Sequence, residues 1–195
     1  MLNIAHIEPQ SYIYGPGCRF VIWVQGCSLH CKGCWNTQMW SFKKKNYISI
    51  EDLLSQIIKE SPSIEGVSFL GGEPLDQFPA VLALSKQIQQ RGLSIMLFSG
   101  YEYQEILSCE KKEILNQVDI LITGRYEAAL RTLTHQWIGS TNQQIHFLTD
   151  RYQGYEIKDA NYMEISIDSM GGISILGFPE EEFLKQEEIT PKRVY

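Results

Sequence analysis

Apolar residues along the chain occur in short blocks whose spacing alternates between that of strands and that of helices. The β-branched and aromatic run at residues 20–24 predicts a short buried strand. Ser49 is a suitable N-cap for a helix over residues 50–59. The apolar side chains of that helix recur at helical spacing: Leu53, Leu54, Ile57 and Ile58. This part of the chain therefore predicts a strand followed by an amphipathic helix.

The alternation continues through the middle of the chain. The segment GVSFLGG predicts a strand that ends in a glycine turn, and LSIMLFSG predicts another strand. Between them a second helix is expected to begin at Pro79 and to end before Gly92. A weaker helix is predicted over residues 104–115, followed by a strand over 118–122. Strands that alternate with helices indicate an α/β fold with a parallel sheet, in which sites gather at the carboxyl ends of the strands.

The last quarter of the chain has a different pattern. From about Tyr162 the sequence YMEISIDSMGGISILGF alternates on both sides of a Ser-Met-Gly-Gly turn, which predicts a β-hairpin. The charged end, PEEEFLKQEEITPKRVY, is expected to be partly mobile. We expect one domain over residues 1–195, with a core at about 13–148 and a hairpin and tail over about 150–195.

Composition supports a single compact domain. The 195 residues are 44% hydrophobic and 21% charged, which is enough for a sizeable core. No run of eighteen apolar residues occurs, and the first ten residues lack the basic and apolar regions of a signal peptide, so a cytoplasmic location is expected and a membrane is not. The net charge is −6, and the dense basic run at residues 43–45 reads as a solvated loop. Nucleic acid is therefore not the expected partner.

Three of the five cysteines lie within eight positions: Cys27, Cys31 and Cys34. In a reducing compartment this spacing favours metal or redox chemistry over disulfides. Thiolates select zinc, copper(I) or iron–sulfur clusters, and a four-iron cluster held by three cysteines keeps one iron open for a ligand with amine and carboxylate groups. The alternative is a zinc site completed by a fourth ligand. Its candidates are His30, His6, Cys18 and Cys109, although His30 is awkwardly adjacent to Cys31.

The C-x3-C-x2-C spacing is the signature of radical S-adenosylmethionine (SAM) enzymes, and GPGCRFVIWVQGCSLHCKGCWN resembles the opening of the glycyl-radical activating enzymes. Within them the chain is most similar to the activators of anaerobic ribonucleoside-triphosphate reductases. The segments SFLGGEPL, LFSGYEYQEI, VDILITGRYEAAL and WIGSTNQQIHFL follow in that family's order, over about residues 13–148. The resemblance implies an incomplete (β/α)6-type partial barrel of about six parallel strands, open where a macromolecular substrate enters, with the hairpin as a C-terminal extension.

The resemblance also implies a SAM site beside the [4Fe-4S] cluster. In the family, the segment that matches Gly71, Gly72, Glu73 and Pro74 meets the amino group of SAM. Ser99 and Gly100 close a strand where a ribose or a methionine carboxylate could sit, Trp35 could stack on adenine, and Asn36 could donate a hydrogen bond. Each residue also has a plain structural interpretation, namely a strand-to-loop turn, a helix N-cap or the packing of the loop.

Candidate substrate contacts are Arg19, Arg125, Tyr126 and Asn142. Arg19 could steer an acidic group of a partner, whereas Arg125, Tyr126 and Asn142 lie in segments short of periodic structure. A surface salt bridge for Arg125 and turn chemistry for Asn142 are equally good interpretations.

The chemistry that the resemblance implies is reductive cleavage of SAM to a 5′-deoxyadenosyl radical, which abstracts hydrogen from a glycine of a glycyl-radical enzyme similar to anaerobic ribonucleotide reductase. Flavodoxin or ferredoxin would supply the electron. No side-chain acid or base is needed, so no catalytic residue is expected beyond the cluster ligands. Two alternatives stay open: a radical SAM enzyme that modifies another peptide or a small molecule, and a non-catalytic zinc-binding module.

Overall fold

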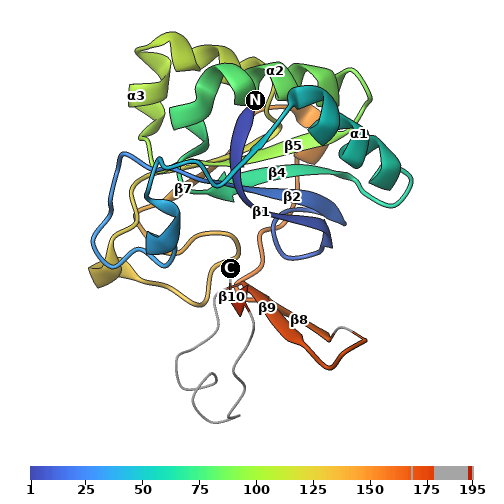
Figure 1. Cartoon of the computed structure of the whole chain (residues 1–195). Helices are drawn as coiled ribbons and strands as arrows, with labels where there is room; N and C mark the ends of the chain where they lie inside the picture. Colours follow the sequence, from blue (N-terminus) through green and yellow to red (C-terminus); the bar gives the residue numbers. More distant parts are fainter. Residues whose placement is uncertain (168, 178–192, 195) are drawn as a thin grey trace.

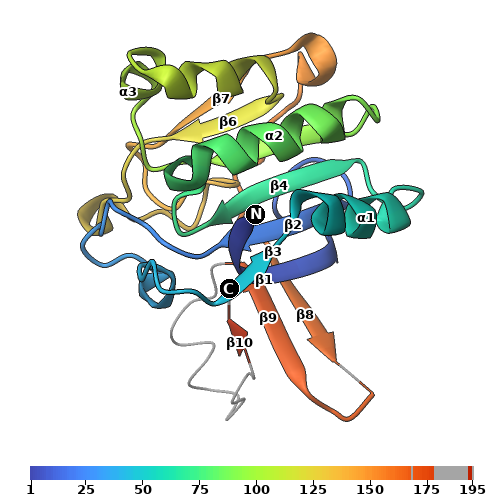
Figure 2. The ribbon, with the colours of Figure 1, turned by 45° about the horizontal axis from the view of Figure 1, so that its top comes forward.

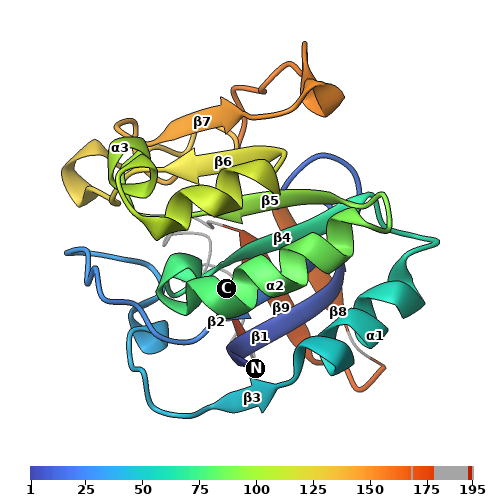
Figure 3. The same cartoon turned by 90° about the horizontal axis from the view of Figure 1, so that it is seen from above.

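A seven-stranded sheet forms the centre of the molecule, with the order β3-β1-β2-β4-β5-β6-β7 (Figures 1 and 3). The computed structural model describes residues 1–167, 169–177 and 193–194. The strands of this sheet are β1 (Leu2–Ser11), β2 (Arg19–Val24), β3 (Asn46–Ile48), β4 (Gly66–Gly71), β5 (Ser94–Phe98), β6 (Ile120–Thr123) and β7 (Gln144–Phe147). The four central strands β2, β4, β5 and β6 are parallel, while β1, β3 and β7 pair antiparallel at the two edges.

The sequence located these four central strands, and the parallel arrangement expected for them is confirmed. Four strands run parallel, rather than the six or so implied by the resemblance. The sequence pattern predicted no strands on the two sides of this parallel core, where β1, β3 and β7 lie. Strand β1 changes register against β2 between Ile4 and His6 and again between Glu8 and Ser11, so its apolar alternation is interrupted.

The α-helices of the described residues cover one face of the sheet (Figures 1 and 2). They are α1 (Ile50–Glu60), α2 (Phe78–Gln89) and α3 (Tyr103–Leu107), and the 3₁₀ helices are η1 (Thr37–Met39), η2 (Pro74–Gln77), η3 (Glu110–Asn116), η4 (Ala128–Leu130) and η5 (Asp150–Tyr152). Ser49 caps α1 as expected, since its side-chain oxygen accepts a hydrogen bond of 3.0 Å from the Asp52 N–H. The helix expected over 104–115 is divided into α3 and η3 because Cys109 has extended backbone angles.

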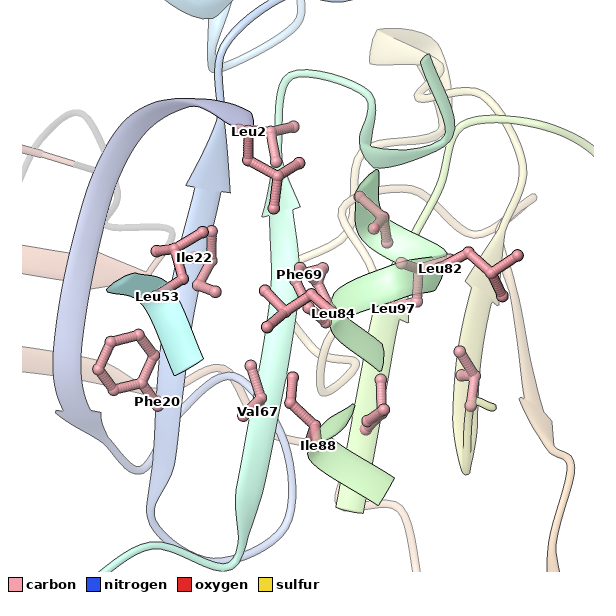
Figure 4. Close-up of a cluster of buried hydrophobic side chains, with 14 of the residues drawn as sticks. Leu2, Phe20, Ile22, Leu53, Val67, Phe69, Leu82, Leu84, Ile88 and Leu97 are labelled. Carbon is pink, nitrogen blue, oxygen red and sulfur yellow. The ribbon is translucent and has the colours of Figure 1, made fainter. Parts of the chain in front are cut away.

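Both faces of the central strands are buried. Along β2, Phe20 and Ile22 pack in the helix-side core, while Val21 and Trp23 belong to a second core on the opposite face. Figure 4 shows the helix-side core, in which Leu53 of α1 and Leu84 of α2 lie over strand residues such as Phe69. Burial on both faces explains why these strands are nearly continuous apolar runs without a polar side.

The predicted hairpin is confirmed. Strands β8 (Met163–Ile167) and β9 (Ile173–Gly177) pair antiparallel, and β10 (Arg193–Val194) adds to β9 in a separate three-stranded sheet. This sheet lies on the side of the central sheet away from the helices (Figure 1). The Gly177 N–H donates a hydrogen bond of 2.8 Å to the Tyr14 hydroxyl, and the Tyr12 N–H donates one of 2.7 Å to the Glu164 carboxylate. Most of the charged end that was expected to be mobile lies outside the described residues.

No helix in the described part of the chain combines the length and the apolar character needed to cross a bilayer.

The structure corrects the interpretation of Arg19. Its side chain is 0% exposed at the amino end of β2, so it cannot meet an acidic group of a partner. The guanidinium donates five hydrogen bonds to buried acceptors, two of which are the Ser68 hydroxyl at 2.6 Å and the Val67 carbonyl at 2.8 Å. Burial lowers the pKa of Arg19. The five hydrogen bonds hold the guanidinium in place. Arg19 is therefore a structural residue at the edge of the sheet opposite to the cysteine loop.

Arg19→Met is expected to lower the free energy of unfolding by about 3–5 kcal/mol, because it removes the donor for several buried acceptors at once. The measurement is urea unfolding of the cluster-free protein. Arg91→Met removes an exposed arginine and should change the stability by less than about 0.5 kcal/mol. Equal stability of the two variants would contradict a structural role for Arg19.

Candidate active site

The four loops that carry the sequence motifs meet at one edge of the sheet. Parallel pairing aligns Val24 with Gly71, Phe69 with Leu97, and Phe98 with Ile122, so the carboxyl ends of β2, β4, β5 and β6 are neighbours. The cysteine loop follows β2, and the other motifs follow the next three strands. The arrangement that the alternating pattern predicted is confirmed.

The three clustered cysteines lie on the loop that follows β2. Cys27 is buried, while Cys31 and Cys34 are half-buried. The Cys34 N–H donates to the Cys31 carbonyl over 3.0 Å, and the Asn36 N–H donates to the Cys34 sulfur over 3.4 Å. Burial raises the pKa of Cys31, and a backbone hydrogen bond from Tyr126 opposes that shift. Backbone donors to sulfur suit thiolates that hold an iron–sulfur cluster, because they stabilise the negative charge on sulfur.

Among the residues that the structure describes, no three His, Cys, Asp or Glu side chains converge on a point where a single ion could sit. A cubane cluster makes a different demand, because each thiolate binds its own iron and the three sulfurs need not share a centre. Burial raises the pKa of Cys27 to about 11, so this thiol is protonated at neutral pH and cluster binding must release its proton. A cluster on this loop would therefore be held by three deprotonated thiols.

Two glycines bring the end of β4 against the end of β2. A Cβ on Gly72 would lie 2.2 Å from the Gly26 carbonyl oxygen, and Gly71 has a φ of +106°. The Gly72 N–H donates to the Val24 carbonyl, and the Glu73 N–H donates to the Gly26 carbonyl, both over 2.8 Å. This close backbone approach requires glycine, and any larger side chain at Gly72 would separate the two loops.

Glu73 connects the ends of β4 and β5. Its carboxylate accepts hydrogen bonds from the Ser99 hydroxyl at 3.0 Å and the Gly100 N–H at 2.8 Å, and one from the Leu75 N–H within its own loop. The side chain is 1% exposed, and burial raises its pKa to about 7. In this structure the carboxylate is therefore occupied by the protein's own donors. Pro74 begins η2 directly after it.

Asp76 ties the cysteine loop to the neighbouring motifs. Its carboxylate accepts from the Ser28 N–H at 2.7 Å and the Ser28 hydroxyl at 3.0 Å, next to Cys27. It also accepts from the Tyr101 hydroxyl at 2.8 Å. This role was not evident from the sequence, because an aspartate in a turn has many interpretations.

A cleft of about 150 Å³ opens between the cysteine loop, the strand ends and the connection from β6 to β7. Its walls include seven of the residues that the sequence singled out: Cys34, Trp35, Asn36, Gly71, Gly72, Ser99 and Tyr126. They also include five residues of the β6–β7 connection: Arg131, Thr132, Trp137, Gly139 and Gln143. Three of these, Trp137, Gly139 and Gln143, belong to the quoted motif WIGSTNQQIHFL, whereas Arg131 and Thr132 carried no sequence signal.

The remaining substrate candidates have structural partners. Arg125 forms a two-fold hydrogen-bonded ion pair with Glu105, at 2.6 and 2.9 Å. The Asn142 amide donates to the Arg125 carbonyl at 2.8 Å. These contacts match the surface salt bridge and turn chemistry that the sequence left open, and neither residue lines the cleft.

Asp76→Ala is expected to loosen the cysteine loop, because it leaves the donors on Ser28 and Tyr101 without their acceptor. The unfolding free energy should fall by about 1–3 kcal/mol, and iron should be lost faster to a chelator. Asp159→Ala, at an exposed position, is the matched control. A role for Asp76 in holding the loop is excluded if both variants retain iron equally well.

Glu73 should make stability depend on pH. Because burial raises its pKa from 4.5 to about 7, the folded protein binds this proton more tightly than the unfolded chain does. The contribution of Glu73 to the free energy of unfolding is therefore greatest at low pH. It is lost as the pH rises from about 5 to about 7, with a slope of at most about 1.4 kcal/mol per pH unit. Urea unfolding across this range should show the slope in the cluster-free wild type and in exposed Glu51→Gln, but not in Glu73→Gln.

Residues 13–146 match the protein family described as "4Fe-4S single cluster domain". The anaerobic ribonucleoside-triphosphate reductase-activating protein of Enterobacteria phage T4 is 32% identical over 156 residues, which cover 76% of this chain and 96% of the relative. The protein of the same name from Vibrio cholerae serotype O1 is 31% identical over 76% of this chain and 99% of its own. The Escherichia coli (strain K12) protein is 28% identical over 75% of this chain and 99% of its own.

A solved structure, that of QueE from Escherichia coli, matches 51% of both chains with a TM-score of 0.39 and 23% sequence identity, which is too distant to bear on function. The family assignment depends on the sequence matches alone. They cover nearly the whole length of the relatives, and they include the cysteine loop and the strand ends that line the cleft. The chain belongs to the 4Fe-4S single cluster domain family and, within it, to the anaerobic ribonucleoside-triphosphate reductase-activating proteins.

Proposed function

We propose that this chain is a radical SAM enzyme that activates an anaerobic ribonucleoside-triphosphate reductase by installing a radical on a glycine of that protein. The observation that carries the proposal is the loop of three cysteines, in a chain of the 4Fe-4S single cluster domain family, that follows β2 and places Cys34 on the wall of the cleft at the parallel strand ends. The curated relatives, which the chain matches over nearly their full length, are named for this activation.

The group that the site holds is a [4Fe-4S] cluster with SAM beside it, and Cys27, Cys31 and Cys34 are its protein ligands. When bound, the reduced cluster and SAM supply a one-electron cleavage that yields a 5′-deoxyadenosyl radical able to take hydrogen from a glycine. The protein residues orient the reactants and exclude water, and none of them needs to act as a general acid or base.

The cleft residues suit this orienting task. Gly71 and Gly72 expose backbone where SAM is expected, and the Ser99 side chain and Gly100 are held at the adjacent strand end by Glu73. Trp35 offers a half-buried aromatic surface for an adenine ring, and the Asn36 side chain is available to a polar group of the cofactor. Tyr126 also lines the cleft, where it would contact the substrate segment.

The proposal also includes an external electron donor and a location in the cell. Flavodoxin or ferredoxin is the expected electron donor, and the cytoplasm is the expected location. A radical SAM enzyme that modifies another peptide or a small molecule is a weaker alternative, because the relatives are named as activators of a reductase. A zinc-binding module is weaker still, because the family is described by a 4Fe-4S cluster.

The direct test is to incubate anaerobically reconstituted, reduced protein with SAM and the anaerobic reductase of the same source, and to record electron paramagnetic resonance spectra. A glycyl-radical doublet on the reductase, with formation of 5′-deoxyadenosine, is the expected result. Deoxyadenosine without a protein radical would favour the alternative radical SAM enzyme. Zinc in place of iron would exclude both.

Cys34→Ser should abolish the cluster absorbance near 400 nm and lower SAM cleavage by at least about 100-fold, because an oxygen ligand replaces a thiolate. Cys109→Ser is the matched control, since Cys109 is an exposed thiol outside the cleft. It should retain the iron content and the cleavage rate of the wild type. An equal loss in both variants would mean that the clustered cysteines are not the ligands.

A further inference from the structure

Arg131 and Trp35 form a pair on the wall of the cleft. The guanidinium carbon of Arg131 lies 5.4 Å from the centre of the Trp35 ring, which is within the range of a cation–π contact. Trp35 directly follows the last clustered cysteine, and Arg131 comes from the β6–β7 connection. Both side chains line the cleft. The pair therefore places a permanent positive charge beside the cysteine loop.

The charge of Arg131 is not neutralised within the described residues. Its guanidinium takes part in none of the ion pairs or side-chain hydrogen bonds found there, whereas Arg125, six positions earlier, uses both ends of its guanidinium on Glu105. The Arg131 backbone is held by an isolated bridge to Ser140, so the position of the residue is supported. The two arginines of this connection thus differ, because Arg125 is paired with Glu105 whereas Arg131 lines the cleft.

A stacked arginine retains its capacity to bind an anion. Contact with an aromatic ring uses the flat face of the guanidinium, while the N–H groups point outward in its plane. That planar edge matches a carboxylate, which can accept two parallel hydrogen bonds from it. The stacking surface also limits the rotamers of the long side chain, so less entropy is lost when the anion binds.

We propose that Trp35 and Arg131 form a carboxylate-binding pair on the wall of the cleft. This inference rests on the proposed function, because that function places two carboxylate sources within reach: the amino-acid carboxylate of SAM and an acidic side chain of the partner polypeptide. Arg131 would recognise either carboxylate by the same bidentate pair of hydrogen bonds. The test below separates them.

The first measurement is equilibrium binding of SAM and of decarboxylated SAM to the cluster-loaded protein, for wild type and Arg131→Gln. If SAM is the source, Arg131→Gln weakens SAM binding by at least about tenfold and leaves the binding of decarboxylated SAM within about twofold. If the partner is the source, SAM binding is unchanged and the reductase concentration for half-maximal radical formation rises by at least about tenfold. Unchanged values in both measurements overturn the proposal.

Arg91→Gln is the matched control, because it removes the same charge from an exposed position on the far end of α2 and should change neither measurement by more than about twofold. Arg131→Lys retains the charge but not the planar fork, and it should recover only part of the binding. Full recovery would show that charge alone acts and would overturn the two-fold recognition. Thermal melting of each variant establishes that it is folded. Failure of the wild type to cleave SAM would refute the proposed function, whereas the binding comparison would still decide the role of Arg131.

Discussion

The close contact between the ends of β2 and β4 fixes the cysteine loop against the glycine turn that follows β4. Two backbone hydrogen bonds of 2.8 Å join Gly72 to Val24 and Glu73 to Gly26. The two backbones are so close that a Cβ at Gly72 would overlap the Gly26 carbonyl oxygen. The cysteine loop begins at this contact, so the three proposed cluster ligands are positioned relative to the neighbouring strand end by the backbone itself. Backbone contacts of this kind are rigid, since they involve no rotatable side chain.

Buried polar side chains extend this frame on both edges of the sheet. Glu73 joins the ends of β4 and β5 at the cysteine edge, and Arg19 joins β2, β4 and β5 at the opposite edge through Ser68 and Ser94. Each is expensive to bury, and each is tolerated because its hydrogen bonds are satisfied by the protein. The pKa of Glu73 is raised because its three hydrogen-bond donors do not fully replace the solvation that the carboxylate loses on burial.

The C-terminal hairpin distinguishes this chain from its curated relatives. Those relatives are matched over 95–99% of their length but over only 72–76% of this chain, and the family match ends at residue 146, before the hairpin begins. The hairpin is nonetheless part of the packed structure, because Leu176 belongs to the same buried cluster as Trp23 and Leu70. Tyr162 and Gly177 line a small second cavity that shares Leu70, Phe98 and Trp137 with the main cleft. The extension therefore reaches the neighbourhood of the active site.

The sequence by itself determined the four parallel strands, the helices α1 and α2, the hairpin and the cysteine ligand pattern. These features depend on local spacing: apolar runs for buried strands, a cap and helical periodicity for α1, and fixed intervals for the thiols. Cys34, Trp35, Gly72 and Ser99, which the motifs singled out, line one cleft because parallel strands place their carboxyl ends together. Local pattern was thus enough for the framework.

Only the tertiary structure decided which side chains face the cleft and which form hydrogen bonds or ion pairs away from it. Arg19 and Arg125 looked available in the sequence, yet one is buried in a hydrogen-bond network and the other is paired with Glu105, twenty positions away. Arg131 and Asp76 carried no signal, but the fold places them beside Trp35 and Ser28. Strand β1, which lies between β3 and β2, was also missed, because its register shifts interrupt the alternation. In each case the deciding contact joins residues far apart in the chain, and no local pattern contains the charge, burial or partner that such a contact supplies.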